Sequence, residues 1–222
     1  MCGFFSTHLN NKSIDKELNQ KCINSLKLLN HRGPDDTEYI NYKNNFLGFS
    51  RLSIIDQDHG KQPMFNNDKS MAIIFNGEIF NYKEILKDHP NLLKSRTSSD
   101  TEVLLNLYIE YGKDMLEMLN GMFAFAIYDR AKNIIFLARD RFGIKPLYYF
   151  QNKNIINFAS EIKPLIAMRK NASPNNKMIS TYLKTSNCDF SKNTFFESIY
   201  QLEAGSYMQI DINNLSQKIT KW

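Results

Sequence analysis

The chain is poor in cysteine, with three among its 222 residues and no Cys-x-x-Cys spacing. An odd number without that spacing argues against a disulfide framework or a zinc site, and it is typical of a reducing compartment. No stretch approaches the ~20 apolar residues that a membrane-spanning helix needs. The start also lacks the basic region and apolar run of a secretory signal. We therefore expect a cytoplasmic protein without a membrane partner.

The chain also lacks any concentrated charge, although its formal net charge is +5. Its lysines are scattered among asparagines and acidic residues, and no basic stripe alternates with aromatic residues. This distribution argues against a nucleic-acid partner. The four histidines are dispersed without an HxxxH or HExxH pattern, so we expect no metal site.

The organisation along the chain predicts one domain, because no internal repeat or low-complexity linker divides it. Apolar residues at 14, 18, 22, 26 and 29 predict an amphipathic helix, and a second helix is predicted over 101–111. Strands are predicted at 1–8, 38–42, 46–51, 71–76, 122–129, 134–138, 147–150, 155–159, 206–210 and 218–220. We expect a hairpin turn at 130–133 and a surface loop at 171–177. Because the strands cluster in blocks without strand–helix alternation, the fold class is α+β with largely antiparallel sheets.

A cysteine directly follows the initiator methionine in the opening stretch MCGFFS. Cys2 has two interpretations. It is either a small buried hydrophobic residue at the start of a strand, or the future first residue of the chain. In the second case its thiol and a free α-amine belong to the same residue.

The apolar run MAIIF stops at Asn76-Gly77-Glu78. The side-chain amide of Asn76 donates two hydrogen bonds, and Gly77 lets a backbone N–H approach a ligand closely. Two donors that converge on one developing negative oxygen form an oxyanion hole. Asn-Gly is also the strongest short signal for a hairpin turn. Taken alone, the tripeptide favours the turn.

Two charged candidates also have structural alternatives. In SSDTE, Ser99 and Glu102 have the spacing of a helix capping box, which places Asp100 in the first helical turn. Asp100 then either complements the helix dipole or holds a ligand ammonium, and alone the first is simpler. Arg51 ends an apolar strand and is suited to a two-pronged bond with a carboxylate. It is equally suited to an ion pair with Asp56.

The motifs gain weight from their order along the chain. They are MCGFF, HRGPD, RLSIID, QPM, NGEIFNY, SDTE, GMFAFAIYD, RDRFGIKPLYY and ASEIKPL. With this set the chain resembles, over its whole length, the glutaminase domain (class II glutamine amidotransferase) of glutamine-hydrolysing asparagine synthetases. Amidotransferases that act on sugar phosphates or in purine synthesis share the Cys-Gly start. Their patterns lack HRGPD followed by RLSIID.

The resemblance implies a four-layer αββα sandwich of the N-terminal-nucleophile (Ntn) hydrolase type, with two mainly antiparallel sheets between helices. It also implies that Met1 is removed and that Cys2 attacks the side-chain amide of glutamine, its own α-amine serving as the base. Asn76 and the backbone N–H of Gly77 are then the implied oxyanion hole. The implied substrate-binding residues are Arg51, Leu52, Ser53, Ile54 and Ile55 for the α-carboxylate, and Glu78 and Asp100 for the α-ammonium.

The resemblance also implies partners. Residues 1–222 correspond to the glutaminase domain, and the ATP-dependent synthetase domain, with its SGGxDS-like loop, is absent from this chain. No cofactor is expected for this domain, because ATP and Mg belong to the synthetase domain, which amidates aspartate to asparagine. A homodimer is a further expectation. RDRFGIKPLYY supplies Arg139, Asp140, Arg141 and Lys145, which either face the synthetase domain or form a surface ion-pair cluster.

Two alternatives stay open at this point. The acceptor of the ammonia is another carboxylate, such as that of a uronic acid sugar, if a different synthetase domain accompanies this one. Alternatively, the chain is a non-catalytic glutamine-binding module that retains Met1.

Overall fold

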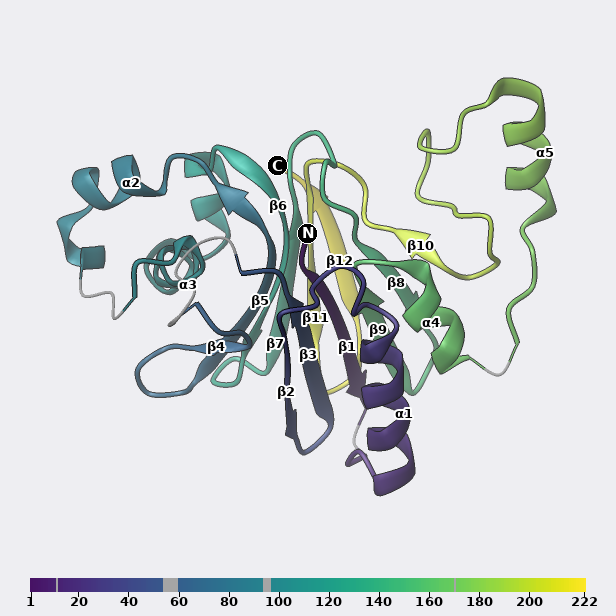
Figure 1. Cartoon of the computed structure of the whole chain (residues 1–222), viewed down its shortest axis with the longest axis horizontal. Helices are drawn as coiled ribbons and strands as arrows, with labels where there is room; N and C mark the ends of the chain where they lie inside the picture. The colour runs from purple at the N-terminus through teal and green to yellow at the C-terminus, as the bar shows by residue number, and fades with distance from the viewer. Residues whose placement is uncertain (11, 54–59, 94–96, 170) are drawn as a thin grey trace.

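The computed structural model describes residues 1–10, 12–53, 60–93, 97–169 and 171–222. Its strands form two stacked six-stranded sheets (Figure 1). The first sheet has the order β10 (Tyr200–Gln201), β8 (Tyr148–Gln151), β9 (Ile155–Ala159), β1 (Gly3–Leu9), β3 (Asn45–Arg51) and β2 (Asp36–Tyr42). The second has the order β12 (Gln217–Lys221), β11 (Ser206–Asp211), β7 (Ile134–Arg139), β6 (Gly121–Asp129), β5 (Met71–Ile79) and β4 (Met64–Phe65). Neighbouring strands pair antiparallel throughout these described sheets.

Helices cover the two outer faces of this sandwich (Figure 1). The first sheet is covered by α1 (Lys16–Lys27) and α4 (Ile162–Met168). The second sheet carries α3 (Asp100–Tyr111), flanked by α2 (Tyr82–Asp88) and by the 3-10 helices η1 (Pro90–Leu93) and η2 (Gly112–Met118). In contrast, α5 (Asn176–Thr185) stands away from the sheets. The predicted four-layer α+β sandwich is therefore confirmed.

Strand β1 lies in the middle of the first sheet and is buried along its whole length. Because successive side chains of a strand point to opposite faces, Phe4 packs between the two sheets and Phe5 packs under α1, against Cys22 and Leu26. This arrangement explains why Phe4 and Phe5 are both apolar although they point to opposite faces of the sheet. It also fixes Cys2, the residue just before β1, at one end of the central layer.

All ten predicted strands and both predicted helices are present, with their ends within three residues of the predicted ones. The turn at 130–133 joins β6 to β7 and is confirmed. The short elements β4, β10, α2 and α4 were not predicted, and α5 begins at Asn176 inside the predicted loop 171–177. Within the described residues, no helix has both the length and the apolar character needed to cross a membrane.

The hairpin turn at Asn76-Gly77 is wrong. Strand β5 continues through both residues to Ile79, and Gly77 pairs with Phe123 of β6. The reason is tertiary: a Cβ on Gly77 would lie 2.3 Å from the carbonyl oxygen of Met122. Glycine is needed here for the close approach of two strands and not for a turn.

Candidate active site

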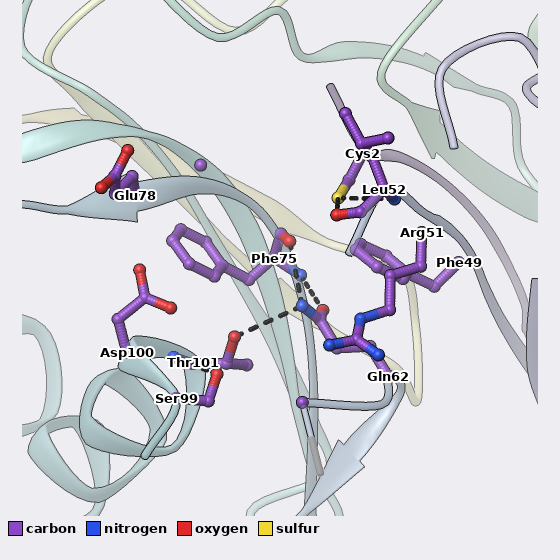
Figure 2. A pocket seen from close by; sticks show the side chains of 12 residues that line it. Cys2, Phe49, Arg51, Leu52, Gln62, Phe75, Glu78, Ser99, Asp100 and Thr101 are labelled. Carbon is purple, nitrogen blue, oxygen red and sulfur yellow. Dashed lines mark hydrogen bonds between the residues drawn. The ribbon is translucent and has the colours of Figure 1, made fainter. Parts of the chain in front are cut away.

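The thiol of Cys2 lies at the end of the sandwich and borders a pocket (Figure 2). Its sulfur accepts a hydrogen bond from the backbone N–H of Leu52 at 3.3 Å and lies 3.5 Å from the carbonyl oxygen of the same residue. Burial raises the pKa of the Cys2 thiol, and the Leu52 hydrogen bond and nearby positive charges offset only part of this. The thiol is therefore mostly protonated at neutral pH, and it needs a base to become a nucleophile.

The free edge of β5 forms one wall of this pocket. Strand β4 pairs only with Ala72 and Ile73 of β5. Further along this edge, side chains form hydrogen bonds with the backbone of β5. Gln62 accepts from the N–H of Phe75 at 2.6 Å and donates to its carbonyl at 3.2 Å. Asp100 accepts from the N–H of Ile79 at 3.0 Å.

Gly77 lies midway between Phe75 and Ile79 on this edge. Because the backbone groups of alternate residues in an antiparallel strand point to the same side, the N–H of Gly77 points to the same edge as the N–H groups of Phe75 and Ile79. Gly77 itself lines the pocket. The strand thus aims one backbone donor at the pocket.

Asn76 adds a second donor beside Gly77. Its side chain is buried, and its amide nitrogen Nδ2 has no hydrogen-bond acceptor among the described residues. A buried polar group without a partner is costly and is expected to have a ligand as its partner. Asn76 and Gly77 therefore offer two N–H donors from adjacent residues of β5.

The charged side chains of the pocket are arranged by sign (Figure 2). Glu78 and Asp100 lie on one side, and Arg51 lies with Cys2 and Leu52 on the other. Burial raises the pKa of Asp100 to about 6, and the neighbouring charge of Glu78 also raises it, against hydrogen bonds from backbone N–H groups. Such a pocket is complementary to a molecule with a carboxylate at one end and an ammonium at the other.

Helix α3 supplies Asp100 from its first turn. The predicted N-cap is confirmed, because the side chain of Ser99 accepts from the N–H of Thr101 at 3.2 Å. Glu102, however, accepts from the N–H and hydroxyl of Thr97 at 2.7 and 2.8 Å. The bond from the N–H of Ile79 to Asp100 holds the helix start at the edge of β5, where Asp100 lines the pocket.

The structure gathers most of the predicted site residues around this pocket. Cys2, Arg51, Leu52, Gly77, Glu78 and Asp100 line it, and Asn76 lies between two lining residues of β5. Ser53 does not line it, and its N–H donates to Asp35 at 2.7 Å. The described residues do not include Ile54, Ile55 or Asp56. The alternative ion pair between Arg51 and Asp56 therefore also lies outside the described residues.

Several residues at the site were not among the sequence predictions. Gln62 belongs to the QPM motif, but nothing local indicates that its side chain completes the edge of β5. Arg32, in the HRGPD motif, donates from Nε to the carbonyl oxygen of Cys2 at 2.9 Å. Glu161, in the ASEIKPL motif, accepts from Nη1 of Arg32 at 3.1 Å. The sequence analysis used both motifs only as whole stretches. It assigned no role to Arg32, which contacts Cys2, or to Glu161, which contacts Arg32.

The RDRFGIKPLYY segment is not a surface ion-pair cluster. Asp140 is fully buried and accepts from the backbone N–H groups of Phe142, Ile144 and Lys145. Arg139 donates to the carbonyl oxygens of Gly143, Lys145 and Leu202. Of the four charged residues in the segment, only Arg141 is exposed, and it pairs with Glu117 at 3.7 Å. The buried side chains of Arg139 and Asp140 thus hold the loop in place through bonds to its backbone.

The described residues contain no group of three or more His, Cys, Asp or Glu side chains placed to hold a metal ion. The polar groups at the pocket include instead the backbone N–H of Gly77, the guanidinium of Arg51 and the carboxylates of Glu78 and Asp100, with the amide of Asn76 beside them. These groups can bind an amino acid and stabilise a negative oxygen next to a thiol.

Comparison with known proteins agrees with this chemistry. A family model described as a glutamine amidotransferase domain matches residues 1–222. The chain is 40% identical over 201 residues to asparagine synthetase [glutamine-hydrolyzing] 2 of Bacillus subtilis. This match covers 87% of this chain and 26% of that protein. It is 35% identical over 235 residues to the putative asparagine synthetase [glutamine-hydrolyzing] 2 of Methanocaldococcus jannaschii, covering 96% of this chain and 44% of that protein. The chain thus spans less than half the length of these relatives.

Solved structures share the fold. A glutamine phosphoribosylpyrophosphate amidotransferase from B. subtilis, complexed with ADP and GMP, superposes with a TM-score of 0.68 at 18% identity. The match covers 99% of this chain and 49% of that chain. At this identity the likeness concerns the fold, which is the four-layer sandwich described above.

Proposed function

The chain belongs to the family of glutamine amidotransferase domains, and on this premise we propose that it hydrolyses L-glutamine to glutamate and ammonia with Cys2 as the nucleophile. The observation that carries the proposal is one pocket lined by a thiol, a guanidinium and two carboxylates (Figure 2). Glutamine has a carboxamide for the thiol and a charged group for each side of the pocket.

The reaction begins at the sulfur of Cys2. Its thiol attacks the side-chain amide carbon of glutamine and forms a carbon–sulfur bond, and the thiol proton passes to the α-amine that removal of Met1 exposes. An α-amine has an ordinary pKa of ~7.7–8.0, so a useful fraction is neutral at working pH. The raised pKa of the thiol makes such a base necessary.

Charge then develops on the amide oxygen. The Nδ2 group of Asn76 and the N–H of Gly77 donate to this oxyanion, which gives the unpartnered amide its acceptor. When the carbon–nitrogen bond breaks, ammonia leaves with the proton held by the α-amine. Water hydrolyses the remaining glutamyl thioester, and glutamate and free Cys2 result.

The ends of the substrate are held by the charged walls. Arg51 binds the α-carboxylate, and Glu78 and Asp100 bind the α-ammonium. The backbone of residues 52–55 is proposed to assist Arg51. The N–H of Ser53 donates to Asp35 in this structure, so its part in this stays a prediction.

The fate of the ammonia follows from the relatives. Their names state glutamine-hydrolysing asparagine synthesis, and we propose that the ammonia serves the ATP-dependent amidation of aspartate in a synthetase domain. ATP and Mg belong to that step. The names of the relatives favour aspartate over the carboxylate of a uronic acid sugar. The cytoplasmic location and the homodimer stay predictions.

The test compares the wild-type chain with Cys2→Ala, and measures glutamate and ammonia released from glutamine. Loss of the nucleophile is expected to reduce turnover by at least ~10³-fold. Cys188→Ala is the matched control, because Cys188 is partly exposed and does not line the pocket. A Cys2→Ala protein that still releases glutamate at the wild-type rate contradicts the proposal. A wild-type chain that binds glutamine without hydrolysing it would favour the non-catalytic binding module.

A further inference from the structure

We propose that Glu161 is a positioning residue for Cys2: its carboxylate holds the guanidinium of Arg32 against the carbonyl oxygen of Cys2 and so fixes how the thiol enters the pocket. The inference rests on the proposed glutaminase activity, and it concerns a residue that lies outside the pocket itself.

Three segments that are distant in the sequence meet at this point. Arg32 follows α1 and donates from Nε to the carbonyl oxygen of Cys2 at 2.9 Å. The same guanidinium donates from Nη1 to Oε1 of Glu161 at 3.1 Å. Glu161 directly precedes α4. One planar guanidinium thus bridges the residue before β1 and the residue before α4.

The packing around Arg32 leaves it little freedom. Its side chain is 9% exposed, and a Cβ on Gly3 would lie 3.1 Å from its Cδ. Ser160, the neighbour of Glu161, anchors the next residue of β1, because its side-chain oxygen accepts from the N–H of Phe4 at 3.0 Å and its own N–H donates to the carbonyl of Phe4. Glu161 is therefore held beside the start of β1.

This anchoring matters because Cys2 lies outside the sheet, which begins at Gly3. Within the described part of the chain, side-chain hydrogen bonds restrain Cys2 at two points: the thiol with Leu52, and the carbonyl with Arg32. The thiol must leave Leu52 when it attacks a substrate. The carbonyl contact then remains to hold the residue, and Glu161 keeps that contact in place.

The carboxylate of Glu161 is charged at neutral pH. Burial alone would raise the pKa of Glu161, but hydrogen bonds from His31 and Arg32 lower it below its ordinary value. Hydrogen bonds between charged partners are stronger than neutral ones. The charge of Glu161 therefore strengthens its hold on Arg32.

His31 provides a built-in control. Its Nε2 lies 2.8 Å from the same Oε1 atom of Glu161, but its side chain is 52% exposed. Exposed pairs of this kind contribute little to stability. His31→Ala thus removes a partner of the same carboxylate on the solvent side and leaves the bond between Glu161 and Arg32 intact.

The experiment measures kcat and KM for glutamine hydrolysis in the wild type, Glu161→Ala, Glu161→Gln and His31→Ala. We expect Glu161→Ala to lower kcat by ~10-fold to ~100-fold, as small displacements of a reacting group do. Its KM is expected to stay within about threefold, because Arg51, Glu78 and Asp100 are untouched. Glu161→Gln, which keeps an acceptor oxygen, is expected to recover part of kcat, and His31→Ala to stay within about twofold of the wild type.

The outcomes separate the two proposals. A wild-type chain that does not hydrolyse glutamine overturns the proposed function, whereas an active wild type with equal kcat in Glu161→Ala overturns only the role of Glu161. A loss in His31→Ala as large as in Glu161→Ala also overturns it, because the exposed side would then carry the effect. If Glu161→Ala fails to fold, Glu161→Gln carries the test, and an unchanged kcat in it contradicts the inference.

Discussion

Strand β1 connects two buried polar clusters that differ in how their hydrogen bonds are satisfied. Further along the strand, Ser6 and His8 are hydrogen bonded to each other at 2.7 Å, His8 to Asn45 at 2.6 Å, and Asn45 to the hydroxyl of Tyr128 at 3.1 Å. We call these four residues the closed cluster. At the start of the strand, Cys2 lines the same pocket as Gly77, and the neighbouring Asn76 has a buried donor without an acceptor in the described residues. We call these three residues the open cluster.

The difference shows what each cluster is for. A buried polar network whose members satisfy one another specifies and stabilises a core. A buried donor left without a partner reduces stability unless a ligand completes it. The closed cluster therefore serves the fold, and we propose that the open cluster is arranged for an oxygen that comes with the substrate.

The largest expected effect comes from comparing alanine substitutions at two asparagines, one in each cluster. Asn76→Ala is expected to lower kcat for glutamine hydrolysis by ~10²–10³-fold, the effect of losing one oxyanion donor. Its thermal midpoint is expected to stay equal or rise, because a buried unpaired donor is removed. The measurement pairs steady-state kinetics with thermal unfolding.

Asn45→Ala is the matched variant in the closed cluster. It leaves His8 and Tyr128 without their shared partner and is expected to reduce the free energy of unfolding by ~1–3 kcal/mol. Its kcat is expected to stay within about twofold, as for a distant independent site. If Asn45→Ala loses activity while Asn76→Ala loses only stability, the distinction between the clusters is wrong.

A smaller effect is expected from the pH dependence of binding. Asp100 has a pKa raised to about 6 by burial, and only its ionised form attracts the ammonium of glutamine. Glutamine affinity, measured by calorimetry on Cys2→Ala to separate binding from chemistry, is expected to fall about tenfold per pH unit below that pKa. Asp100→Asn is expected to bind weakly and without this dependence. Equal affinity at pH 7 and pH 5 in Cys2→Ala would remove Asp100 from the binding site.

The smallest effect concerns His8 in the closed cluster. Burial lowers the pKa of His8 to about 3, against the hydrogen bond with Asn45. In the unfolded chain, the imidazole of His8 binds a proton as the pH falls through about 6.5, whereas in the folded chain it stays neutral down to about pH 3. The contribution of His8 to the free energy of unfolding is therefore complete above pH 6.5 and is lost as the pH falls towards 3. The loss is expected to be about 1.4 kcal/mol per pH unit. Urea unfolding of the wild type and His8→Gln at pH 7 and pH 5 measures it, and an identical pH slope in both proteins contradicts the assignment.

The sequence indicated the residues of the open cluster, but it did not indicate their backbone conformation or the residues that support them. Its residues Cys2, Asn76 and Gly77 were named because their residue types carry chemistry and because the motifs occur in a known order. The conformation of Asn76-Gly77 was not predictable from the tripeptide. The local preference of Asn-Gly is for a turn. The extended conformation depends instead on the close approach of β6, which is a property of the folded pair of strands. A Cβ on Gly77 would lie only 2.3 Å from the carbonyl oxygen of Met122.

The supporting residues were not predictable for a related reason. Arg32 and Glu161 are 129 positions apart, and Gln62 is 13 positions from the strand edge that it completes. No periodicity links residues at such separations. The short strands β4 and β10 contain two residues each, too few for an alternating pattern, and they form because a neighbouring strand offers its edge.

The central claim is that one residue supplies both the sulfur and the base. The most direct test expresses the chain with a cleavable extension before Cys2, and measures glutamine hydrolysis before and after a protease releases Cys2 as the first residue. The account predicts almost no turnover in the extended protein and full turnover after release, with the same fold by circular dichroism. Equal turnover before and after release would show that the α-amine of Cys2 is not the base.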